Sequence, residues 1–85
     1  MSEDGNWNVS VTGPGNAYYT TLIARTSAER AAGRGYHEAL GAAKAEPGPG
    51  WTVTCTLKRK SRKEAAEMRR FRTNAAGELE ESVTP

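Results

Sequence analysis

Apolar and polar residues alternate along a short stretch near the start of the chain. Residues 7–12 read Trp-Asn-Val-Ser-Val-Thr, a period of two that is typical of a strand with one buried face. Residues 17–25 are dominated by aromatic and β-branched side chains and predict a second strand. Gly-Pro-Gly-Asn at 13–16 joins the two stretches, and each of these residues favours a turn. The pattern therefore predicts an antiparallel hairpin.

Small apolar residues recur at helical spacing after the hairpin. Alanine and glycine repeat at intervals of three and four, which predicts a helix that ends near Lys44. Thr26 and Glu29 fit a capping box at its start. Because the inward stripe is made mostly of Ala and Gly, we expect the helix to lie close to the sheet. Tyr36 and Leu40 would be its main apolar anchors.

A further strand pattern follows the helix-breaking sequence Glu-Pro-Gly-Pro-Gly. Residues 51–57 place Trp, Val, Cys and Leu on one side of a strand and three threonines on the other. The predicted order is then strand, strand, helix, strand. A right-handed crossover would set this strand parallel to the second one. An order of three antiparallel strands also fits the length of the connection.

The C-terminal region carries a second capping pattern, Ser-Arg-Lys-Glu at 61–64. It predicts a helix over residues 62–75, with Ala65, Met68 and Phe71 on its apolar side and arginines on its flank. The same region could instead form two short strands around the turn Asn-Ala-Ala-Gly.

These elements predict an α+β fold. We expect a small three-stranded sheet in ββαβ order packed on one helix, followed by a C-terminal basic amphipathic helix, with a terminal hairpin as the alternative. Residues 1–6 would be a disordered lead-in, 7–76 one α+β domain and 77–85 an acidic flexible tail. A chain of 85 residues buries only about 60–65 % of its unfolded surface. A homodimer is therefore expected, because it would add apolar burial.

The charge of the chain is concentrated in one segment. Residues 57–72 hold eight Lys or Arg and two Glu, a charge of +6, while the rest holds four cations and eight anions, a charge of −4. Such asymmetry favours an anionic partner. The candidate binding residues are Lys58, Arg59, Lys60, Arg62, Lys63, Arg69, Arg70 and Arg72. They would form one ridge from the strand end to the helix flank, beside the polar sheet residues Asn8, Ser10, Thr12, Thr52, Thr54 and Thr56.

Two functions are compatible with this basic ridge. The first is a small non-enzymatic accessory or regulatory protein that binds the phosphate backbone of DNA or RNA. The second is a protein-protein interaction module, such as an inhibitor or adaptor of the phage or mobile-element type. That module would dock the same surface on an acidic partner, and its free sheet edges could add a partner strand.

The sequence offers little for catalysis. The lone histidine, His37, falls in the middle of a predicted helix, and the lone cysteine, Cys55, is in phase with core residues. One His and one Cys do not make a metal site or a nucleophile pair. We therefore expect no enzyme, metal or cofactor. The chain has neither a long apolar run nor a signal-peptide pattern, so we expect a cytoplasmic protein without membrane contact.

Overall fold

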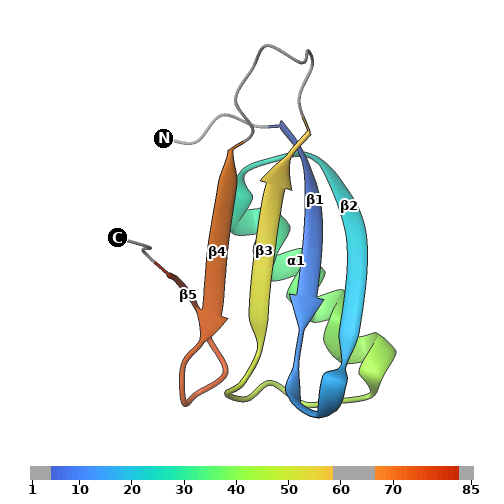
Figure 1. Cartoon of the computed structure of the whole chain (residues 1–85), viewed down its shortest axis with the longest axis vertical. Helices are drawn as coiled ribbons and strands as arrows, with labels where there is room; N and C mark the ends of the chain where they lie inside the picture. The colour runs from blue at the N-terminus through green and yellow to red at the C-terminus, as the bar shows by residue number, and fades with distance from the viewer. Residues whose placement is uncertain (1–4, 59–66, 83–85) are drawn as a thin grey trace.

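Among the residues that the structure describes, five strands form one antiparallel sheet and one helix crosses a face of it. The computed structural model describes residues 5–58 and 67–82. The elements are β1 (Gly5–Thr12), the 3-10 turn η1 (Pro14–Asn16), β2 (Tyr18–Thr26), α1 (Ala28–Ala43), β3 (Thr52–Leu57), β4 (Met68–Thr73) and β5 (Leu79–Glu81). The sheet order is β2-β1-β3-β4-β5, and α1 lies behind the sheet in Figure 1.

This architecture corrects the fold class expected from the sequence. The sheet has five strands rather than three; β3 runs parallel to β2, as a crossover requires, but β1 lies between them and pairs with both. The expected helix over 62–75 is wrong, because residues 68–73 form β4 and a turn follows it. Residues 79–81, expected in a flexible tail, form β5 and pair with β4. The two last strands thus form the terminal hairpin that the sequence left as an alternative.

The helix prediction failed because the two apolar residues of β4 are three apart, a spacing that fits a helix and not a strand with one apolar face. On a helical wheel, Met68 and Phe71 fall on the same side. In the strand they lie on opposite faces, with Met68 54 % exposed and Phe71 5 % exposed. Pairing with β4 also satisfies backbone N–H and C=O groups along the edge of β3. That gain depends on long-range contacts, which a local pattern does not contain.

Asn74 closes the hairpin between β4 and β5. Its Oδ1 accepts hydrogen bonds from the backbone N–H groups of Ala76 and Glu78, at 2.9 and 3.1 Å. The N–H of Gly77 donates to the Asn74 carbonyl at 2.9 Å. Gly77 has a φ of 83°, and a Cβ there would lie 2.6 Å from the backbone nitrogen of Gly48. Both the conformation and the close approach therefore require glycine.

Tyr36 connects the helix to this hairpin. Its hydroxyl donates to the carbonyl of Gly77 at 3.1 Å and accepts from the N–H of Gly48 at 3.3 Å. Its ring meets Trp51 edge to face, with the ring centroids 5.9 Å apart. These contacts join α1, the loop before β3 and the β4–β5 turn at one end of the sheet.

The ends of α1 differ slightly from the predicted ones. Ser27, and not Thr26, is the N-cap, and its Oγ accepts the N–H of Arg30 at 3.4 Å. The Thr26 carbonyl instead accepts the indole N–H of Trp7 at 2.9 Å. At the other end, Lys44 adopts a left-handed conformation with a φ of 54°, which stops the helix.

The core lies between α1 and the inward side chains of the central strands. Trp7, Val9 and Val11 of β1 have no exposed surface. The helix contributes mainly alanines to this layer, so its axis approaches the sheet closely. At Gly35, an added Cβ would lie 2.4 Å from Cγ1 of Val9. The helix and β1 therefore pack with almost no space at this point.

Two glycine substitutions on α1 test this close contact. A Cβ at Gly33 has no neighbour within 4 Å, so Gly33→Ala is expected to raise the free energy of unfolding by about 0.5–1 kcal/mol. Gly35→Ala is expected to lower it by about 1–3 kcal/mol, because Val9 or the helix must move. Denaturant unfolding followed by circular dichroism measures both. Equal stabilisation by the two variants would contradict the close packing.

Candidate nucleic-acid interface

Alternation along β4 sends its arginines to two different faces of the sheet. Arg69 is paired with the buried Cys55 of β3, so it lies on the face that α1 covers. Arg70 is paired with Thr54 and Arg72 with Thr52 on the opposite face, which we call the open face. The predicted ridge required Arg69, Arg70 and Arg72 to share one surface. Arg69 instead lies on the other face of the sheet from Arg70 and Arg72.

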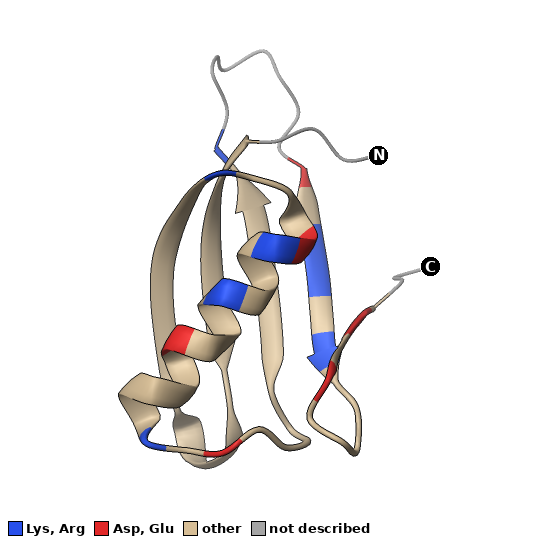
Figure 2. Cartoon of the chain, turned by 180° about the vertical axis from the view of Figure 1, so that it is seen from behind, with Lys and Arg blue, Asp and Glu red and all other residues tan. Residues whose placement is uncertain are grey.

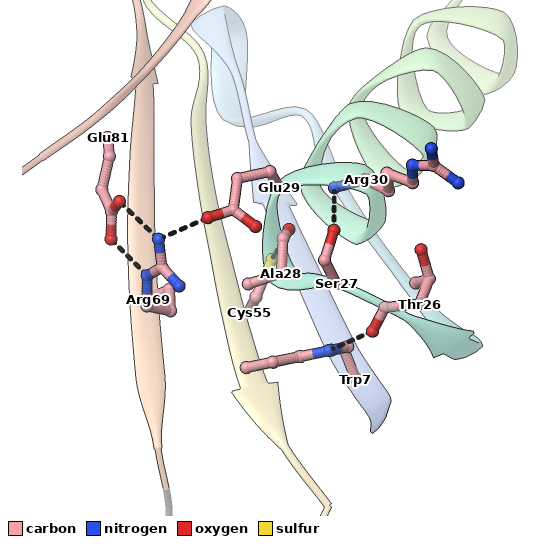
Figure 3. Close-up of polar contacts among 9 residues, drawn as sticks. All are labelled: Trp7, Thr26, Ser27, Ala28, Glu29, Arg30, Cys55, Arg69 and Glu81. Carbon is pink, nitrogen blue, oxygen red and sulfur yellow. Dashed lines mark hydrogen bonds and ion pairs between the residues drawn. The ribbon is translucent and has the colours of Figure 1, made fainter. Parts of the chain in front are cut away.

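Arg69 joins three elements through a forked set of ion pairs (Figure 3). Its Nη2 lies 2.8 Å from Oε1 of Glu29 at the start of α1, and its Nε and Nη2 both donate to the carboxylate of Glu81 in β5. The Arg69 side chain is only 19 % exposed. A bidentate pair matches the planar guanidinium to a carboxylate and fixes both side chains. Arg69 thus holds α1 and β5 against β4.

The partners in this cluster stabilise each other's charged forms. The hydrogen bond from Arg69 lowers the pKa of the Glu81 carboxyl below its ordinary value, against a smaller opposing effect of burial. The pKa of the Arg69 guanidinium is raised, chiefly by its hydrogen bond to Glu81. Because two carboxylates of the same chain neutralise the Arg69 guanidinium, it is poorly available to bind an external anion.

The open face carries polar side chains in three cross-strand rows. The strand registers place Tyr18, Thr12, Thr52, Arg72 and Glu80 in one row, Thr20, Ser10, Thr54 and Arg70 in the next, and Leu22, Asn8, Thr56 and Met68 in the third. All six polar sheet residues expected from the sequence are therefore brought together. In Figure 1 this face is turned toward the viewer, with α1 on the far side. Hydroxyl groups fill its centre and arginines stand at its β4 side.

Arg70 and Arg72 are the cations of this face. Both are exposed, and within residues 5–58 and 67–82 neither forms an ion pair. Nη2 of Arg72 lies 3.5 Å from Oγ of Ser82, at the outer limit of a hydrogen bond. Glu80 is opposite Arg72 on β5, and its carboxylate accepts from Nδ2 of Asn74 at 3.1 Å. Arg70 has no such carboxylate opposite it and is the more available cation.

The remaining predicted cations follow β3. Lys58 is exposed, and its N–H donates to the carbonyl of Asn6 at 2.9 Å, at the end of the sheet where β4 begins. The other four predicted site residues lie outside the described residues: Arg59, Lys60, Arg62 and Lys63. Figure 2 shows from the helix side that Lys and Arg colour much of β4, while α1 carries both signs of charge.

Two exposed apolar residues of β2 were missed as surface features in the sequence reading. Tyr18 is 67 % exposed and Leu22 is 52 % exposed, and both lie on the open face. The strand from residue 17 to 25 was identified by its composition, which does not say which face is covered. The sequence gives no signal for this choice, because residues 18–23 read Tyr-Tyr-Thr-Thr-Leu-Ile and place the same residue types on both faces.

The two residues considered for catalysis are in unlike surroundings. Cys55 is fully buried, its Sγ lies 3.8 Å from the carbonyl of Ala28, and burial raises the pKa of its thiol to about 12. A thiol with that pKa holds little nucleophilic thiolate at neutral pH. His37 is exposed on α1. In the described part of the chain, no three His, Cys, Asp or Glu residues gather as a metal site would require.

Comparison with known proteins adds no functional information. The chain matches no protein-family model, no curated protein and no solved structure. Over the described residues, no helix has the length and apolar character needed to cross a membrane. The function is therefore inferred from the surfaces of the molecule itself.

Acid unfolding of a Glu81→Gln variant tests the Arg69 cluster. Because the folded-state pKa of Glu81 is lowered, its contribution to stability is present above its ordinary pKa near 4.5 and is lost as pH falls through the folded value. The variant is expected to be about 0.5–1 kcal/mol less stable at pH 7, a modest value because the Glu81 side chain is 39 % exposed. It should also lose less stability than the wild type on acidification.

Glu78→Gln is the matched control, because it removes the same charge from the same hairpin outside the ion pairs. Thermal unfolding at pH 7 and pH 3 measures the difference. If both variants respond to acid as the wild type does, the cluster does not contribute to stability as described.

Proposed function

We propose that this protein is a small non-enzymatic nucleic-acid-binding protein, accessory or regulatory in role. Its open sheet face and the basic segment after β3 would contact the phosphate backbone. The single observation that carries the proposal is the position of Arg70 and Arg72, exposed on one face and outside the ion pairs of the described residues. Guanidinium groups in that state are available for charge-assisted hydrogen bonds to phosphate.

The hydroxyl groups beside these arginines support the same proposal. Thr54 lies opposite Arg70, Thr52 lies opposite Arg72, and Ser10 lies next in the row of Thr54. Ser and Thr side chains commonly donate to phosphate oxygens, and such contacts position a protein without reading bases. A flat face of this composition favours backbone binding with little base discrimination.

The positive charge of the sequence after β3 also supports nucleic-acid binding. Lys58 is exposed at the end of β3, and four further cations follow it within residues 59–63. A cluster of one sign raises the local concentration of anionic ligands and speeds their association. Arg69 is excluded from this set because Glu29 and Glu81 compensate it.

A salt titration with a double variant tests the proposal. Arg70→Ala with Arg72→Ala is expected to weaken binding to a 20-base-pair DNA duplex. If each arginine meets one phosphate, the slope of log K against log salt should become shallower by about 2. Fluorescence anisotropy at several salt concentrations measures both affinity and slope. Duplex RNA and single strands of the same length, used in parallel, identify the preferred nucleic acid.

The control is Arg30→Ala with Arg34→Ala, which removes the same net charge from exposed positions of α1. This variant should keep the slope of the wild type, because α1 covers the other face of the sheet. Absence of binding by the wild type at low salt, or equal loss in both double variants, would refute the open face as the binding surface.

A further inference from the structure

The two edges of the sheet are built very differently. β5 is three residues long, and glutamates at 78, 80 and 81 surround it with negative charge. A short, charged strand protects a sheet edge against pairing with another chain. β2, at the other edge, is nine residues long and carries no charge from Tyr18 to Ala24. Arg25 and a register shift interrupt its far end, but the stretch from Tyr18 to Ala24 lacks such protection and is open to a further strand.

The exposed side chains of β2 are arranged symmetrically about its third residue. Tyr18 and Leu22 both lie on the open face, and Thr20 lies midway between them on that face. These two residues are among the three large apolar side chains that are exposed in the described chain, with Met68 as the third. Across a twofold axis at this threonine, the apolar residue on one side meets the apolar residue on the other side in a second copy.

The helix side of the same edge is also apolar. A groove of about 220 Å³ opens there between the start of β2 and the end of α1. Its lining includes Ala17, Tyr18, Tyr19, Ala39, Ala42 and Ala43. Apolar surface is therefore available on both faces at the start of β2, where the groove extends inward to Trp51.

We propose that a second copy of this chain pairs with the first, antiparallel along β2, about a twofold axis at Thr20. In this register Tyr18 lies opposite Leu22 of the second copy, and Leu22 lies opposite its Tyr18. Arg25 falls opposite Gly15, beyond the paired strands, so the two Arg25 side chains do not oppose each other. The result is one continuous sheet of ten strands, from two five-stranded sheets.

The β2 edge is complementary to itself, which favours a second copy of the chain over an unrelated extended segment as the strand that pairs with it. The same Tyr18–Leu22 contact forms twice, and the paired stretch has no charge to repel itself. A chain of 85 residues also buries a limited share of its surface alone, so added apolar contact stabilises it.

The axis of such a pair stands perpendicular to the sheet, so both open faces lie on the same side. Seven strand spacings of about 4.8 Å would separate the two β4 strands, a distance of about 34 Å. That is close to one turn of B-form DNA, about 34–36 Å. This consequence rests on the proposed function, whereas the pairing itself does not.

Sedimentation of the purified full chain without nucleic acid tests the pairing. The wild type is expected to form a dimer over about 10 μM to 1 mM, and Thr20→Lys is expected to raise the dimer Kd by about tenfold or more, since two lysines would meet at the axis. Thr12→Lys is the matched control: it places the same residue on the same face, one strand inward. It should leave the dimer intact.

Disulfide formation gives a second readout that does not depend on weakening the dimer. Thr20→Cys should cross-link across the axis, because directly opposed residues have Cα atoms about 4.5–5.5 Å apart. Thr12→Cys lies three strand spacings across and four residues along from its counterpart, about 20 Å away, and should not cross-link. The native Cys55 is buried and does not compete.

A wild type that stays monomeric across that concentration range overturns the proposal. So does a dimer that survives Thr20→Lys, or one in which Thr20→Cys fails to cross-link. Because no nucleic acid is present, these outcomes leave the proposed function unaffected. Loss of DNA binding with an intact dimer would refute the proposed function alone.

Discussion

The structure depends on one constraint: one described helix, sixteen residues long, covers one face of a five-stranded sheet. The covered face is apolar where α1 shields it from water, and α1 contacts β1, β2 and β3. The close approach of Gly35 to Val9 makes this layer thin and nearly free of space. Outside the irregular end of β2, the position of a residue along its strand then decides whether its side chain lies on the covered face or on the open face.

The arginines of β4 show how the face of the sheet on which a side chain lies decides whether it is ion-paired or exposed. Neighbouring residues in one basic run receive different roles, because alternate side chains point to opposite faces. Arg69 turns toward α1 and joins Glu29 and Glu81, so it contributes to the architecture. Arg70 and Arg72 turn outward beside threonines and stay available to a ligand. The proposed binding surface is thus the open face that α1 leaves uncovered.

The pattern of residues was sufficient for some elements and insufficient for others. The first and third strands and α1 were predicted because alternating or helical runs allow one period only, and the second strand was predicted from its composition. The segment at 68–73 was misassigned, because its two apolar residues follow the helical spacing and lie on opposite faces of the strand. Of the predicted binding residues, Lys58, Arg70 and Arg72 are exposed at or beside the open face. Arg69 was misplaced with them, because a helical wheel merges positions that a strand separates.

Local features of this protein follow directly from its residues: the periods of β1, β3 and α1, the turn residues, and the concentration of positive charge in residues 57–72. The tertiary structure alone decided the pairing of β3 with β1 and β4, the side to which each arginine points, and which edge is exposed. The physical reason is that backbone pairing and the compensation of Arg69 join residues far apart in the chain. Glu29 and Arg69 are forty residues apart, and no local pattern records that they meet.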